Sequence, residues 1–197
     1  MNADEILTKM PFLKVREGGR DGIAAFDCPP QNLKEAVSVL KSDFSFDSLC
    51  DIASVDMGED APRRFGCVYH FYSMKGKYYL RLASFAESAE TPKLQSISDI
   101  FANANWFERE AFDMMGIVFE GHPDLRRILM WDKYEWHPLR KDFPLAGRES
   151  TLPDTYEDAV GDDPMFVKPA PMEGGPFHSE PGAKFAACKE PRSREQK

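Results

Sequence analysis

Residues 65–83 read FGCVYHFYSMKGKYYLRLA, and this stretch decides the fold class. On each side of Lys75-Gly76-Lys77, the residues that can be buried recur at every second position. A period of two places one set of side chains on each face of a strand. Two such segments around a short glycine-containing turn predict a β-hairpin.

The segments before this hairpin predict further strands and two helices, the first a short helix that begins at the Asn2-x-x-Glu5 capping box and ends at Pro11. Residues 12–16 and 23–27 favour two short strands joined by a glycine-rich loop, and residues 49–55 favour a third strand. Pro29-Pro30 favours a helix start. The apolar residues that follow recur at the i, i+3, i+4, i+7 spacing of a helix with one buried face. They are Leu33, Ala36, Val37 and Leu40.

After the hairpin, two helices and two strands are expected. Thr91-Pro92 favours a short helical stretch, and Asn105-x-x-Glu108 has the spacing of a capping box for a helix over residues 106–115. Gly116 suits the end of that helix, where a left-handed backbone conformation costs glycine least. Residues 117–119 and 127–131 favour two short strands.

From Ala146 onward the composition changes, because seven of the fifteen prolines lie in residues 146–197 and no hydrophobic period is visible there. We therefore expect an α+β domain of two layers over residues 1–145. It would have a small mixed or antiparallel sheet with a few helices on one face. An extended, proline-rich tail would follow over residues 146–197. Its spaced apolar residues suit a segment that becomes ordered on a partner.

Composition excludes several classes of function. A net charge of −8 argues against nucleic-acid binding. No apolar run is long enough to cross a bilayer, and the first residues resemble neither a secretory signal nor a transit peptide. The cysteines Cys28, Cys50, Cys67 and Cys188 form no C-x-x-C pair. We expect neither an iron-sulfur cluster nor structural zinc, and interpret the cysteines as small buried apolar residues.

Residues 105–145 hold all three tryptophans, with acids first and bases later. An enzymatic interpretation would pair Glu110 with Asp113, which share a helix face at i and i+3, as a general acid and base. The favoured alternative is structural: acids are stabilised at a helix start, and Arg109 and Asp113 would form an ordinary i, i+4 ion pair. Glu108 and Glu110 point to different sides and cannot share a substrate.

Other chemistries find little support in the same segment. A metal site would need His122 and His137, which are far apart and lack a ligand spacing, so a local hydrogen bond in each His-Pro turn is favoured. No phosphate-binding glycine loop or nucleophile motif is present. Tryptophan, tyrosine, methionine and arginine are enriched in protein interfaces, so a large permanent contact surface is the remaining interpretation. A tryptophan in the domain core is its alternative.

Two motifs in this segment resemble a known family. The first is Glu108-Arg109-Glu110-x-x-Asp113-Met114-Met115, followed after six residues by His122-x-x-x-Arg126-x-Ile128-Leu129. The second is His137-Pro138-Leu139-Arg140-Lys141-Asp142-Phe143-Pro144-Leu145. Together they resemble the signature of the 30-kDa subunit family of respiratory complex I, the NADH:quinone oxidoreductase, whose bacterial members are its C subunits. The resemblance spans roughly residues 1–145.

The resemblance implies a non-redox, structural subunit of the peripheral arm, on the cytoplasmic side of a bacterial inner membrane. Its partners would be the D and B subunits of complex I, and it would touch the membrane only through the complex. The chain would hold no flavin, iron-sulfur cluster or quinone of its own, because these belong to partner subunits. The complex would pass electrons from NADH to quinone with coupled ion translocation, and the isolated chain would show no catalysis.

The signature residues divide by expected role. A supporting helix would be built by Trp106, Glu108, Arg109, Glu110 and Asp113. Polar contacts with partners would come from Arg126, Arg127, His137, Arg140 and Lys141, and His122 belongs to the first motif. The tail after Leu145 departs from many relatives, and we expect Met165-Phe166-Val167 and Pro176-Phe177 to contact a partner there.

Three alternatives stay open. The same subunit could serve a membrane-bound hydrogenase or another quinone-reducing complex, which its companion genes would reveal. A free-standing hydrolase using Glu110 and Asp113 would show turnover as a purified chain. A regulatory module would be found away from membranes.

Overall fold

The computed structural model describes residues 3–17, 21–145 and 147. Its main sheet has the strand order β1-β2-β5-β4-β3, with one parallel pair, β2 with β5, and antiparallel pairs elsewhere. These strands are β1 (Lys14–Val15), β2 (Ala24–Cys28), β3 (Ser48–Asp56), β4 (Phe65–Ser73) and β5 (Tyr78–Phe85). A second, parallel pair consists of β6 (Lys93–Gln95) and β7 (Val118–Glu120). The helices are α1 (Ala3–Lys9), the 3-10 turn η1 (Pro30–Asn32), α2 (Leu33–Asp43) and α3 (Ala104–Met115).

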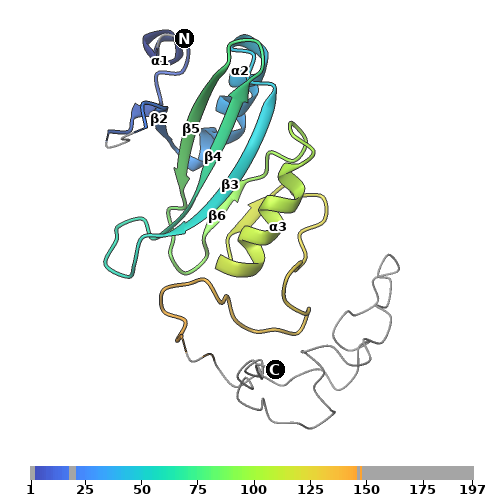
Figure 1. The fold of residues 1–197 in the computed structure, drawn as a ribbon. Helices are drawn as coiled ribbons and strands as arrows, with labels where there is room; N and C mark the ends of the chain where they lie inside the picture. The colour runs from blue at the N-terminus through green and yellow to red at the C-terminus, as the bar shows by residue number, and fades with distance from the viewer. Residues whose placement is uncertain (1–2, 18–20, 146, 148–197) are drawn as a thin grey trace, which may run out of the picture. The chain divides into compact units, whose positions relative to one another are not determined.

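The predicted hairpin forms the centre of the sheet, with β4 paired to β5 from Gly66 opposite Phe85 to Ser73 opposite Tyr78. Because buried and less buried side chains alternate along β4, one face of the sheet packs against the helices and two layers result. Phe65, Tyr69 and Phe71 are almost fully buried on one face, in the same core cluster as apolar residues of α1, α2 and α3. In Figure 1, α3 lies beside β3. The expected α+β fold with helices over one sheet face is confirmed.

Helix α2 also follows its predicted pattern, because Leu33, Ala36, Val37 and Leu40 are its buried residues. The prediction that the cysteines are buried is wrong for Cys50, which is exposed at the irregularity in β3, whereas Cys28 and Cys67 are buried. Cys188 lies outside the described residues. Among the described helices, none has both the length and the hydropathy to cross a bilayer.

Two predicted elements after the hairpin are wrong. The stretch after Thr91-Pro92 forms strand β6, because β7 supplies a parallel partner from beyond α3. Residues 127–131 form no strand, since the backbone N–H groups of Ile128, Leu129 and Met130 donate to a carboxylate instead of to a neighbouring strand. Both errors arise from contacts that are distant in the sequence.

The predicted capping box at Asn105 and Glu108 is also wrong. Helix α3 begins at Ala104, its N-cap residue is Asn103, and the Asn103 side chain makes no capping hydrogen bond. That side chain instead donates to the backbone oxygen of Leu49 in β3. Glu108 is fully buried and accepts hydrogen bonds from the segment that joins β6 to α3.

Candidate assembly surface around helix α3

The carboxylate of Asp113 organises the segment that follows β7. Asp113 is fully buried on α3, and its Oδ1 accepts a 2.6 Å hydrogen bond from Nη1 of Arg127. Its Oδ2 accepts from three consecutive backbone N–H groups, those of Ile128, Leu129 and Met130, at 2.7–3.0 Å. Burial alone would raise the pKa of Asp113, but these backbone donors and Arg127 outweigh it and lower the pKa. One carboxylate therefore satisfies three backbone donors that no strand pairs.

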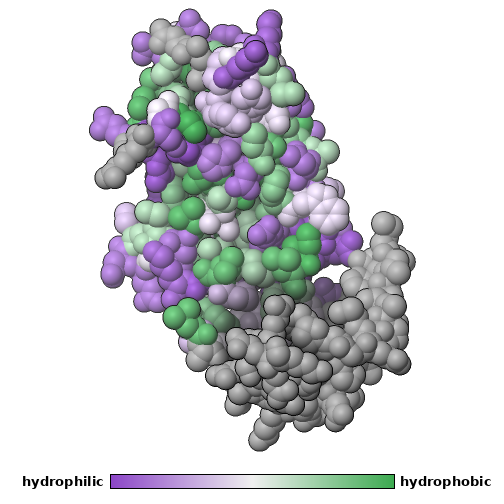
Figure 2. Space-filling model, in the orientation of Figure 1, coloured by the Kyte–Doolittle hydropathy of each residue, from purple (hydrophilic) through white to green (hydrophobic). Residues whose placement is uncertain are grey.

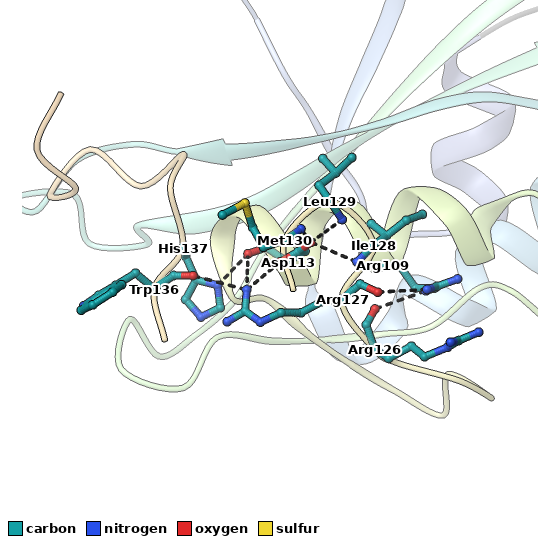
Figure 3. A network of polar contacts seen from close by, with 9 residues as sticks. All are labelled: Arg109, Asp113, Arg126, Arg127, Ile128, Leu129, Met130, Trp136 and His137. Carbon is teal, nitrogen blue, oxygen red and sulfur yellow. Dashed lines mark hydrogen bonds and ion pairs between the residues drawn. The ribbon is translucent and has the colours of Figure 1, made fainter. Parts of the chain in front are cut away.

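Two arginines also bind backbone oxygens in and around this segment, as Figure 3 shows. Arg109 donates to the backbone oxygens of Arg126 and Arg127, at 3.2 and 3.0 Å. Nη1 of Arg127 also donates to the backbone oxygens of Asp113 and Trp136. The expected Arg109–Asp113 ion pair is therefore replaced, because Asp113 pairs with Arg127 and Arg109 binds carbonyl groups.

The second motif, residues 137–145, here called the exit motif, completes the C-terminal end of α3. The last carbonyl groups of a helix have no partner within it. Here the backbone oxygen of Asp113 contacts Nδ1 of His137 at 2.9 Å, that of Met114 accepts from Leu139 N–H at 3.1 Å, and that of Met115 accepts from Nε of Arg140 at 2.7 Å. Positive charge at this end also complements the helix dipole. The His-Pro-Leu-Arg sequence thus caps a helix that ended more than twenty residues earlier.

Gly116 makes this capping possible in two ways. Its φ is +73°, the left-handed conformation expected of a C′ residue, and its N–H donates to Phe112 O at 2.9 Å. A Cβ atom at this position would overlap Nη2 of Arg140 and the His137 ring. Glycine is therefore required both by the backbone and by the two side chains of the exit motif.

A second charged cluster joins the exit motif to the sheet. Arg64 donates to both oxygens of buried Asp56 at 3.0 Å and lies 3.2 Å from Asp142. The Lys141 backbone N–H donates to Asp56 at 2.8 Å. Burial would raise the pKa of Asp56, but the hydrogen bonds from Arg64, Lys141 and Gly58 lower it to about 2. The cluster fixes residues 141–142 to the ends of β3 and β4.

Asp56, Arg64 and Phe65 belong to this site, although no sequence motif pointed to them. The Phe65 ring lies near two guanidinium groups, those of Arg64 and Arg140, each 4.6 Å from its centroid. The available signal was the adjacency of two predicted strands, which places Asp56 of β3 opposite Phe65 of β4. Nothing local in the sequence connects them with residue 140.

Glu108 forms a separate buried polar contact on α3. Its carboxylate accepts from Ser96 Oγ at 2.6 Å and from Ile97 N–H at 2.8 Å, and Nε2 of His122 lies 3.9 Å away. Burial raises the pKa of Glu108 to about 7. Burial also lowers the pKa of His122, whose Nδ1 accepts from the Asp124 backbone and whose Nε2 contacts Asn105 O. Burial therefore disfavours the charged form of both groups.

The two histidines therefore lie at different ends of α3, against Asn105 and Asp113 respectively. The local hydrogen bond expected at each His-Pro turn is present at His122, whereas His137 bonds across a separation of 24 residues. In the described ranges, no three side chains of the metal-ligating types gather. Glu110 is exposed while Asp113 is fully occupied, so the geometry does not favour an acid-base pair.

Several signature residues lie at the surface. Apolar areas lie between polar ones on the face shown in Figure 2. Trp106 is 60% exposed, Leu129 61% and Leu139 55%, so the core interpretation fails for Trp106. Arg126, Lys141 and Glu110 are exposed as well. Trp131 and Trp136 are half-buried and pack edge-on against Tyr134. Exposed aromatic, apolar and charged side chains of this kind are typical of protein contacts.

Comparisons with known proteins identify the family. Residues 26–149 match the family model described as "Respiratory-chain NADH dehydrogenase, 30 Kd subunit". The chain is 46% identical, over 137 residues, to the C 2 subunit of NADH-quinone oxidoreductase from Rhizobium meliloti (strain 1021), and the match covers 68% of this chain and 74% of that protein.

Two solved structures share the fold. The trypsin-resistant fragment (1–134) of Nqo5 is 31% identical with a TM-score of 0.53, covering 62% of this chain and 95% of the fragment. A chain of the membrane-bound sulfane sulfur reductase, an archaeal respiratory membrane complex, has a TM-score of 0.62 at 22% identity, covering 72% of this chain and 83% of that chain.

Proposed function

Because the chain belongs to the 30-kDa subunit family of respiratory-chain NADH dehydrogenases, we propose that its role there is structural and that it carries out no redox step itself. It is a subunit of a multi-subunit NADH-quinone oxidoreductase, and we assign it to the peripheral arm by resemblance to the family. Its chemical inactivity and its precise neighbours are the parts that we propose.

The observation that supports a structural role is how the family signature uses its hydrogen bonds. Arg109, Asp113, Arg127 and His137 bind one another or the backbone of residues 113–136. A catalytic carboxylate would need a free oxygen for a substrate proton, whereas both oxygens of Asp113 are already occupied by four donors. The signature builds a surface rather than a reaction centre.

We assign the neighbours by resemblance to the family. The partners would be the D and B subunits, on the cytoplasmic side of the bacterial inner membrane, and contact with the membrane would come through the complex. Flavin and iron-sulfur clusters would be held by partner subunits and none by this chain. Of the five residues expected to make polar contacts, Arg127 and His137 are bonded within the chain. Arg126, which pairs with Asp124, and Lys141 are exposed, and Arg140 is half-buried.

Affinity purification of the tagged full chain from detergent-solubilised membranes tests this function. We expect the chain to be recovered with the other complex I subunits, and NADH:quinone activity to follow the complex and not the isolated chain. Turnover of any substrate by the purified chain, or its recovery without membrane-bound companions, would overturn the proposal. Crosslinking within the recovered complex would identify the D and B subunits as neighbours or replace them.

The Arg140→Ala variant separates a structural role from a chemical one. Because Arg140 binds the backbone of α3 and faces outward, we expect complex assembly and quinone reductase activity to fall together. Lost activity in a fully assembled complex would assign this chain a direct part in the reaction.

The archaeal sulfane sulfur reductase carries a related fold, so an equivalent subunit of another membrane-bound complex is the second candidate. A flavin-bearing, NADH-oxidising companion decides between them. Its recovery with the tagged chain supports NADH:quinone oxidoreductase, and its absence from an otherwise intact complex supports the alternative.

A further inference from the structure

The side chain of Arg140 is held in place by three features of the domain. Its Nε donates to the backbone oxygen of Met115 at 2.7 Å. Its guanidinium group lies 4.6 Å from the centroid of the Phe65 ring. Gly116, which lacks a Cβ, leaves the space that Nη2 occupies. An arginine held at one nitrogen and against one aromatic ring has lost most of its rotamer freedom before it meets any partner.

The terminal nitrogens Nη1 and Nη2 of Arg140 make no hydrogen bond with any of the described residues. Within the part of the chain that the structure describes, Nε makes the hydrogen bond of this guanidinium. Arg140 as a whole is partly exposed. Other arginines of the signature differ, because the terminal nitrogens of Arg109 and Arg127 donate to carbonyl or carboxylate oxygens of this chain.

Among the described residues, no carboxylate forms an ion pair with Arg140. The two nearby carboxylates, Asp56 and Asp142, both lie against Arg64. Burial lowers the pKa of Arg140, and the field of Arg64 adds to this, while Asp142 and Asp56 only partly oppose the change. The positive charge is therefore partly desolvated and incompletely balanced within the described part of the domain. A negative charge from another chain would neutralise it.

We infer that the free end of Arg140 receives a carboxylate of an aspartate or glutamate from a neighbouring subunit. Two terminal N–H groups in one plane match the two oxygens of a carboxylate. Exposed Leu139 adjoins this cation, and Nε2 of His137 borders the same space above Gly116, so polar and apolar groups adjoin as they do in protein interfaces. The inference rests on the proposed subunit role, and it selects one residue and one partner chemistry from the signature.

Carbodiimide crosslinking of the Arg140→Lys variant in the intact complex tests this contact. Carbodiimide joins an amine directly to a carboxylate and leaves the natural guanidinium unreacted. We expect mass spectrometry to find residue 140 linked to an aspartate or glutamate of another subunit. The matched control is Arg63→Lys, an exposed arginine, which should give no such link. Links from the natural Lys141 report equal reagent exposure in both samples.

A second variant tests the same contact if the Arg140→Lys subunit does not assemble. The Arg140→Gln subunit should leave the immobilised complex at lower salt than the natural subunit does. We expect its affinity to be weaker by about 30-fold or more, which is the effect of truncating one member of an interfacial charge pair. Arg63→Gln should leave the release point unchanged. Any one of three results would overturn the inference. They are links from residue 140 only to Asp56 or Asp142 of the same chain, no link at residue 140, and an unchanged release point for Arg140→Gln.

A small anion is the other occupant that this cation could take, and inorganic phosphate tests it. We expect phosphate to shift the unfolding temperature of the purified natural chain no more than it shifts that of Arg140→Gln. If phosphate raises the unfolding temperature of the natural chain and not that of Arg140→Gln, the site binds a free anion and the inference is overturned.

These results also separate this inference from the proposed function. If the natural chain is not recovered with companion subunits, the subunit role itself fails. If the complex is recovered intact and residue 140 gives no link to another subunit, only the Arg140 contact fails.

Discussion

Asp113 and Arg127 form a 2.6 Å ion pair across fourteen residues, with the Asp113 side chain fully buried and that of Arg127 11% exposed. The other Asp113 oxygen binds three successive backbone N–H groups. A single carboxylate on α3 thus replaces the strand partner that residues 128–130 would otherwise need, and its removal has a predictable cost.

Asp113→Asn should destabilise the full chain by roughly 3–5 kcal/mol, because it strands buried Arg127 and places an amide donor against backbone donors. Urea unfolding of the purified chain measures this. The control is Asp124→Asn, since the Asp124–Arg126 pair is largely exposed at 2.9 Å and should be worth about 1 kcal/mol or less. Similar losses for both variants would contradict a central role for Asp113.

Glu108 should make stability fall as pH rises. Its pKa is raised to about 7 in the folded chain, so the folded state holds a proton that the unfolded state releases near its ordinary value of 4.5. The stabilisation is complete below pH 4.5 and is lost as pH rises through about 7. Glu108→Gln should flatten this decrease when unfolding free energies are compared across that range.

Glu110→Gln is the control for that comparison, because Glu110 is an exposed glutamate of the same helix. Its pH profile should follow that of the natural chain. A Glu108→Gln profile that falls as steeply as the natural one would show that another group carries the dependence.

Gly116→Ala should cost more than Gly121→Ala. Both glycines have positive φ, +73° and +84°, so each substitution adds backbone strain of about 1–2 kcal/mol. At Gly116 the added Cβ must also displace Arg140 and His137, whereas at Gly121 it meets nothing. Thermal unfolding of the two variants separates the two effects, and equal shifts would mean that the packing above Gly116 is unimportant.

Trp106→Ala should weaken assembly and leave the chain itself nearly as stable. The ring is 60% exposed and its centroid lies 5.2 Å from the Arg109 guanidinium, so we expect a loss of about 1 kcal/mol or less in the purified chain. Native gels of solubilised membranes should show less complete complex. The control is Met74→Ala, an exposed apolar residue at the hairpin turn, which should assemble normally.

Deletion of residues 150–197 should reduce the amount of complex, because Met165-Phe166-Val167 and Pro176-Phe177 are expected to contact a partner. These residues lie outside the described part of the chain, and the prediction rests on the sequence. Native gels measure the complex, with replacement of those apolar residues by serine in the full-length chain as the second variant. Normal complex levels for both would remove the tail from the interface.

The local periodicities predicted the central hairpin and α2 correctly, because a period of two marks a strand and the i, i+3, i+4, i+7 spacing marks a buried helix face. The Tyr69 and Phe71 side chains point into the core as their period of two requires, and Leu33 and Leu40 mark the buried face of α2. The end of α3 at Gly116 was also predictable, since a left-handed C′ residue is a local requirement.

The connections of the candidate site were not predictable from local pattern. Leu94 lies in a strand and not a helix because β7 comes from beyond α3, and residues 128–130 avoid a strand because Asp113 binds their N–H groups. Glu108 was interpreted as a capping residue, although its partners precede it by eleven and twelve residues. In each case the observed hydrogen bonds join residues that the local sequence pattern does not connect.

The capped end of α3 fixes the rotation of that helix. Three successive carbonyl groups, from Asp113 to Met115, each have a different donor from residues 137–140, so turning the helix by one residue, about 100°, would unpair all three. One residue inserted between Trp106 and Asp113 would therefore point the Trp106 ring in another direction, whereas an insertion between Met130 and Trp136 would leave its aim unchanged. Length variation in related chains should accordingly be tolerated after the helix and rejected inside it.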